Sequence, residues 1–278
     1  MSPVRTPARR RRGAAPAAAR RGRWNLRILM PGLPLQACSV LITRGREHIV
    51  IDTGFPQHDS LLLDGLAAAS ITPDEVGAVI NTHYHLDHCG GNFLFPRAQF
   101  YGSRNDYDWA VNIYNSVCSG ETRREVFRQF YPEAGDDEFD RMDQARLLQL
   151  LRWMWDPAVL GPRERYRWLE EHALPFSGLR VIPTPGHTPG HISLVVEGRD
   201  GDYLIAGDAR PFAEDTANQQ DMPPWKQRLA ARSRDRILRF EGVVIPGHDD
   251  PFSQTGEAAE AGEDGGLALT NAGATGSA

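Results

Sequence analysis

Four side chains that bind metal ions stand within six residues of this chain, in the run His83-Tyr84-His85-Leu86-Asp87-His88. The run follows Val76–Ile80, an apolar segment that predicts a buried strand. Imidazole and carboxylate groups hold zinc and similar divalent ions. Alternation along an extended segment projects His83 and His85 to one side, and Asp87 and His88 then face a second position. The run therefore predicts a fold in which a strand ends at a metal site.

Four other segments carry a histidine or an aspartate where an apolar stretch ends. They are Val50-Ile51-Asp52-Thr53-Gly54, Thr184-Pro185-Gly186-His187-Thr188-Pro189-Gly190-His191, Ile205-Ala206-Gly207-Asp208-Ala209 and Ile245-Pro246-Gly247-His248-Asp249. Because this pattern of a strand followed by a ligand recurs along most of the chain, a chance cluster of histidines is a poor explanation.

In their order and in their residue types, the five segments resemble the metallo-β-lactamase-fold hydrolase superfamily, from about Ala37 to about Pro251. The resemblance implies an α/β (α+β) fold, a four-layer αββα sandwich with the metals at one sheet edge. It also implies a dinuclear site in which His83, His85 and His187 hold one metal, Asp87, His88 and His248 hold the other, and Asp208 bridges both. By the same resemblance, Asp52 supports a metal-binding histidine through a hydrogen bond. We expect two divalent ions, Zn²⁺ first, with Mn²⁺ or Fe²⁺ as alternatives.

A dinuclear site of this kind predicts hydrolysis. Metal coordination lowers the pKa of water to about 7, so a serine or cysteine nucleophile is not required. We expect a hydroxide held between the metals to attack a carbonyl carbon of a small-molecule substrate. In this hypothesis, Asp208 bridges the metals and Asp87 shuttles a proton to the leaving group.

The expected substrate is an ester or a lactone. N-acyl-homoserine lactonases resemble this chain in Asp87–Asn92, in Thr184–His191 and in the helical insertion described below. Two alternatives stay open within the same fold: a glyoxalase-II-like thioesterase and a persulfide dioxygenase with a single iron. Zinc β-lactamases are disfavoured, because the branches that we compared lack the bridging aspartate, which is Asp208 here.

The charge distribution argues against nucleic acid as a partner. The formal net charge is −5, but residues 1–23 hold eight arginines and no acid, so the remainder carries 23 − 36 = −13. Phosphate binding needs clustered Lys and Arg on a folded face. We therefore expect a small-molecule substrate and no nucleic acid, and the oligomeric state is left open, with a homodimer as one option.

The chain is long enough for one large domain with tails. We predict a disordered basic tail over 1–23, one hydrolase domain over 24–253 with a helical insertion at about 103–175, and a disordered tail over 254–278. No apolar stretch approaches a signal-peptide core or a membrane span, and three cysteines suit a reducing compartment, so the expected location is the cytoplasm, away from membranes.

Three residues near the motifs are predicted to serve the fold. Cys89 is expected to be a small packed thiol, because the implied ligand set is complete without it. His191 competes with His187 for one ligand position and is expected to be a structural hydrogen bonder. Tyr84 should pack beneath the site, since alternation points it away from His83 and His85.

Overall fold

The computed structural model describes residues 22–133, 135–141, 157–214 and 224–255. Most of the two predicted tails lies outside these ranges, so their predicted disorder stays a prediction. Within the described part of the chain, no helix has the length and the apolar character that crossing a membrane requires.

The first sheet has the strand order β1-β2-β3-β4-β5-β6. Its strands are β1 (Asn25–Met30), β2 (Ser39–Arg44), β3 (Glu47–Ile51), β4 (Ala78–Ile80), β5 (Gln99–Gly102) and β6 (Tyr166–Trp168). The first three form an antiparallel meander, and β3 to β6 run parallel to one another. Because β3 and β4 are parallel, the residues that follow them emerge at the same edge of the sheet.

The second sheet has the order β11-β10-β9-β8-β7. Its strands are β7 (Leu179–Pro183), β8 (Ile192–Glu197), β9 (Asp202–Gly207), β10 (Gly242–Pro246) and β11 (Phe252–Gln254). All neighbours are antiparallel except β9 and β10, which are parallel. The carboxyl ends of β9 and β10 therefore lie side by side, with Asp208 after one and His248 shortly after the other.

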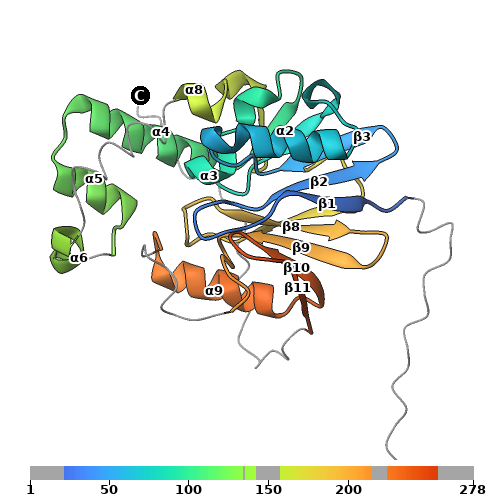
Figure 1. Cartoon of the computed structure of the whole chain (residues 1–278). Helices are drawn as coiled ribbons and strands as arrows, with labels where there is room; N and C mark the ends of the chain where they lie inside the picture. The colour runs from blue at the N-terminus through green and yellow to red at the C-terminus, as the bar shows by residue number, and fades with distance from the viewer. Residues whose placement is uncertain (1–21, 134, 142–156, 215–223, 256–278) are drawn as a thin grey trace, which may run out of the picture.

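The two sheets pack face to face and helices cover both outer faces (Figure 1). Strand β3 shows how the sequence builds these layers: Ile49 and Ile51 point into the core between the sheets, and Val50 points to the core under the helices. A strand buried on both faces needs an unbroken apolar run, as here. On the far face, Ile237 of α9 (Gln227–Leu238) packs on Leu204 and Val244. The predicted αββα sandwich is confirmed.

The remaining helices connect the strands; several of them cover the outer face of the first sheet, and those between residues 123 and 141 lie beside the sandwich (Figure 1). They are α2 (Asp59–Ala68), α3 (Leu86–Cys89), α4 (Arg104–Ser119), α5 (Arg123–Phe130), α6 (Asp136–Arg141), α8 (Pro157–Leu160) and the 3₁₀ turns η1 (Pro56–His58), η2 (Pro73–Glu75), η3 (Asn92–Leu94) and η4 (Arg163–Arg165).

The predicted insertion at about 103–175 contains four of these helices, but it also contains strand β6. This strand pairs with β5, and Tyr166 stacks on Phe100 with ring centroids 5.2 Å apart. Three residues are too few to show a strand period in the sequence, so tertiary pairing alone defines β6.

Candidate metal centre

The motif at His83 to His88 lies where β4 leaves the first sheet. His83 and His85 emerge from the loop on one side, with ring centroids 4.7 Å apart. The chain then enters the short helix α3, which carries Asp87 and His88. Tyr84 is fully buried between Tyr107 and Tyr166, as expected for a residue that packs beneath the site.

His187 comes from the loop between β7 and β8. Its Nε2 atom lies 3.0 Å from Nδ1 of His85. The preceding residue, Gly186, has a φ of 137° and lies so close to α9 that a Cβ atom there would be 2.1 Å from the backbone nitrogen of Ala230. Close packing against α9 therefore holds the His187 loop over the first sheet's histidines.

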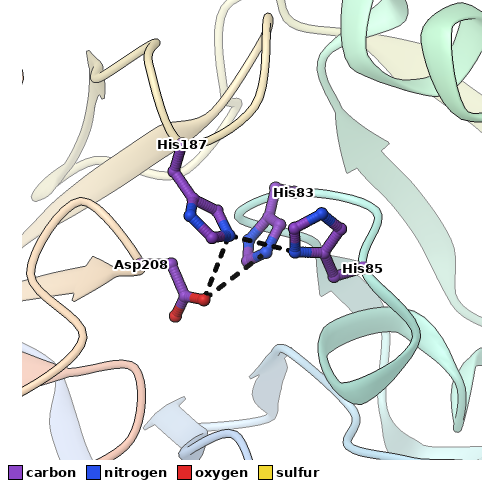
Figure 2. Close-up of side chains that lie close together, drawn as sticks. All are labelled: His83, His85, His187 and Asp208. Carbon is purple, nitrogen blue, oxygen red and sulfur yellow. Dashed lines mark hydrogen bonds and ion pairs between the residues drawn. The ribbon is translucent and has the colours of Figure 1, made fainter. Parts of the chain in front are cut away.

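Asp208 follows β9 and presents its two carboxylate oxygens to two different groups of ligands. Oδ2 lies 3.2 Å from Nε2 of His187 and 3.9 Å from Nε2 of His83 (Figure 2). Oδ1 lies 3.3 Å from Nε2 of His88 and 3.3 Å from Nε2 of His248. This is the arrangement that a carboxylate shared by two cations requires.

The structure thus gathers all seven predicted ligands into two groups. In each group, one candidate ligand atom per residue lies within 4.8 Å of the others: His83, His85, His187 and Asp208 in the first, and Asp87, His88 and His248 in the second. We call these the first group and the second group. Asp87 Oδ2 and His248 Nε2 are 3.4 Å apart.

The chemistry of the two groups fits divalent cations. The Nε2 atoms of His83 and His88 and the Oδ1 atom of Asp208 are buried and make no hydrogen bond to any residue that the structure describes. Burying such atoms without a partner costs free energy, and cations at the two groups would supply the partner. Zinc accepts this set of imidazole and carboxylate ligands.

Residues 32–248 match the family model of the metallo-beta-lactamase superfamily. The chain belongs to the metallo-β-lactamase superfamily. The metallo-beta-lactamase domain-containing protein 1 of Rattus norvegicus is 31% identical over 244 residues, which are 86% of this chain and 76% of the relative. An N-acyl homoserine lactonase of a Bacillus species is 23% identical over 251 residues, 80% of this chain and 85% of that enzyme.

Solved structures of the metallo-β-lactamase superfamily share the fold. A dizinc quorum-quenching lactonase in complex with a product matches with a TM-score of 0.52 at 16% identity, over 73% of this chain and 67% of that one. At this identity, the match supports the architecture alone.

As in the superfamily resemblance, Asp52 contacts a candidate ligand. Its Oδ2 lies 2.7 Å from Nδ1 of His88, and its Oδ1 accepts a hydrogen bond of 2.8 Å from the Thr82 backbone N–H. The Thr82 hydroxyl donates to Oδ2 and therefore accepts from Nδ1 of His83, 3.1 Å away. Both contacts place a proton on Nδ1, so Nε2 of each histidine is the atom left to bind a cation.

His248 is oriented by a backbone group that the sequence does not reveal. Its Nδ1 lies 3.0 Å from the carbonyl oxygen of Leu33, in the loop between β1 and β2. Gly32 makes this approach possible, because a Cβ there would lie 2.4 Å from the backbone nitrogen of Asp249. No residue type at position 33 signals this role, since every residue has the same carbonyl group.

Burial and charge set the protonation of the site. Burial lowers the pKa of His83 and His85, helped by neighbouring histidines, and both are neutral as metal ligands must be. Burial also opposes a charge on His248, but Asp208 and then Asp87 outweigh it and raise the pKa of His248 to about 9. Burial opposes ionisation of Asp208, yet His248, His88 and His187 hold its pKa well below the usual value. A cation that binds His248 therefore displaces a proton.

His191 has no ring nitrogen left for a metal. Its Nε2 accepts a hydrogen bond of 3.0 Å from the backbone N–H of Asp208, so Nδ1 carries the proton and donates to the Thr184 hydroxyl, 2.8 Å away. Thr184 then donates to Ser193 Oγ, which donates to the carbonyl of Ala206. His191 holds Asp208 in place and is a structural hydrogen bonder, as predicted.

Proposed function

We propose that this protein is a hydrolase of small carboxylic esters or lactones, with N-acyl-homoserine lactones as the first candidates, and that it uses two zinc ions. The observation that carries the proposal is the Asp208 carboxylate, which offers one oxygen to each group of ligands. Two cations bound there would supply Lewis acidity for water and for a carbonyl oxygen. The lactone is inferred from similarity to the N-acyl homoserine lactonase, and zinc is inferred from the imidazole and carboxylate ligand set.

The residues of the chain take two roles in this proposal. The histidines of the two groups act as neutral ligands, and hydrogen bonds donated by Nδ1 of His83, His88 and His248 fix the direction of their Nε2 atoms. Asp87 lies in the second group with its carboxylate partly exposed, so it is placed to carry a proton between the site and solvent.

Cys89, which adjoins the candidate ligand His88 in the sequence, is poorly suited to act as a nucleophile. Its side chain is fully buried in the core beneath the helices. Burial raises the pKa of the Cys89 thiol well above its usual value, helped by Asp52 and Asp87. A thiol held protonated is a poor nucleophile, so we propose attack by water.

The completeness of the second group favours the hydrolase over the persulfide dioxygenase with a single iron. Asp87, His88 and His248 stand as close together as the ligands of the first group. A cation bound at this second group in addition to the first would distinguish the hydrolase from an enzyme that uses one iron.

The test is pH-stat titration of the protein loaded with zinc or manganese, with homoserine lactones of short and long acyl chain. We expect the wild type to release acid from the lactones and the zinc-loaded Asp208→Ala variant to release none. Parallel assays use S-lactoylglutathione as a thioester substrate and bis(p-nitrophenyl) phosphate as a phosphodiester substrate. Turnover of the thioester without any lactone would replace the proposal with a thioesterase, and cleavage of the phosphodiester alone would reject carboxylic ester chemistry.

A further inference from the structure

We propose that Asp106, which belongs to neither group of ligands, is a positioning residue that sets the geometry of the first group. It does so by joining the two loops that carry His83, His85 and His187. The proposal rests on the metal centre proposed above, but it does not depend on the identity of the substrate.

Asp106 lies in the first turn of α4 and its side chain is completely buried. Its Oδ2 accepts a hydrogen bond of 3.0 Å from the backbone N–H of Tyr84. Its Oδ1 accepts a hydrogen bond of 2.9 Å from the backbone N–H of Gly190. One carboxylate therefore bonds to two segments that come from different sheets.

Both bonded residues stand beside candidate ligands. Tyr84 separates His83 from His85, so the bond to its N–H holds the peptide unit that joins His83 to Tyr84, one residue before His85. Gly190 lies in the loop that carries His187 and leads to His191. Since His187 Nε2 and His85 Nδ1 are 3.0 Å apart, a small shift of one loop against the other changes how the first group closes around a cation.

Gly190 has the residue type that this contact demands. A Cβ atom at position 190 would lie 2.1 Å from Oγ of Ser103 and 2.7 Å from the backbone nitrogen of Asp106. Real Cβ atoms do not approach so closely. The loop that contains Gly190 therefore packs in direct contact with the start of α4.

The start of α4 is itself held firmly. Ser103 caps the helix by accepting from the backbone N–H of Asp106, and its hydroxyl donates to Oε1 of Glu170 at 2.7 Å. Oε2 of Glu170 accepts from the backbone N–H of Arg104 at 3.0 Å. Asp106 thus acts from a fixed position.

An acidic residue in the first turn of a helix usually serves the helix alone, by interacting with its dipole. The two hydrogen bonds of the Asp106 carboxylate instead leave α4 for Tyr84 and Gly190. Burying a carboxylate is costly, and these bonds offset that cost only while both loops stay in place.

The decisive variant is Asp106→Asn, because an amide keeps the shape of the carboxylate but has one acceptor oxygen for two N–H donors. We expect the affinity of the first group for Zn²⁺ or Co²⁺ to fall about 10–100-fold, the range for residues that orient ligands. Asp108→Asn is the matched control: it lies on the same helix, its side chain is partly exposed, and it pairs with Arg163 at the surface. This control should bind both cations as the wild type does.

A double-mutant cycle assigns the effect to one group. In a His248→Ala background, which disables the second group, Asp106→Asn should weaken binding of the remaining cation about 10–100-fold. In a His187→Ala background, Asp106→Asn should leave the remaining affinity unchanged. Equilibrium dialysis with metal analysis measures both. Equal losses in the two backgrounds, or no loss in either, would overturn the proposal.

Thermal unfolding of the metal-free proteins separates positioning from general stability. The metal-free Asp106→Asn variant should keep a cooperative transition. If it does not fold, Glu170→Gln replaces it, since this change loosens the start of α4 from a partly exposed position, and unchanged affinity of the first group would then refute the proposal. A wild type that binds two cations but hydrolyses no ester would refute the proposed function and leave this inference standing.

Discussion

The Nδ1 atom of His88 lies 2.7 Å from Oδ2 of Asp52, a residue that precedes it by 36 positions. Asp52 follows β3 and has a φ of 55°, a backbone conformation that is uncommon for a residue with a side chain. The carboxylate is also held by the backbone N–H of Thr82 after β4. The parallel pairing of β3 and β4 is what brings an early aspartate to a later histidine.

Replacing Asp52 by asparagine should weaken metal binding and activity together. The amide can place its NH₂ group against Thr82 N–H or against His88 Nδ1, and either choice breaks one bond of the pair. We expect a loss of about 10–100-fold in metal affinity. Metal titration of the variant measures it, with Asp64→Asn on the exposed side of α2 as control. Wild-type affinity would show that His88 does not need Asp52.

Replacing Asp208 by alanine should remove the second cation and most of the activity. This change deletes the carboxylate that faces both sets of ligands, and we expect activity to fall by more than about 100-fold, since even residues that merely orient ligands cost up to that much. Metal analysis and initial rates on the same sample provide the measurement. A variant that retains two cations per chain would contradict the bridging role.

His187→Ala and His191→Ala should differ in kind. His187→Ala deletes a candidate ligand and should abolish most of the activity with a modest change in stability. His191→Ala leaves the buried N–H of Asp208 without its acceptor, at a cost of about 1–3 kcal/mol of unfolding free energy. Urea unfolding and kcat of both variants test this. Comparable losses of rate would overturn the assignment of His187 as the ligand.

One thiol should react with DTNB in the native protein, and all three should react after unfolding. Cys38 and Cys89 are buried and Cys118 is exposed. Burial, with Asp52, raises the pKa of Cys38 to about 12, so raising the pH from 7 to 9 leaves it a protonated thiol. The native count should therefore stay at one over this range. A second fast-reacting thiol at pH 9 would show that the core opens around Cys38.

The resemblance of five sequence segments to the metallo-β-lactamase superfamily implied both the seven candidate ligands and the αββα architecture. In the structure the ligands follow the carboxyl ends of β4, β7, β9 and β10 within a few residues, or lie in α3 directly after the first of these loops. The alternation of apolar residues in a strand and the residue types of the ligand segments are local properties of the sequence. Both can therefore be recognised without the tertiary structure. Whether cations bind the assembled groups stays a prediction for the metal analysis above.

Only the tertiary structure revealed β6, the Leu33 carbonyl on His248 and the Asp106 carboxylate between two ligand loops. These features depend on contacts between residues far apart in the chain, and each uses a group with no distinctive local pattern: a three-residue strand, a backbone carbonyl, and an aspartate in the first turn of a helix. The sequence by itself determined which imidazole and carboxylate side chains are available as metal ligands. Packing decided how they are oriented, because the hydrogen bonds that hold Nε2 toward a cation come from whatever segment the fold brings alongside.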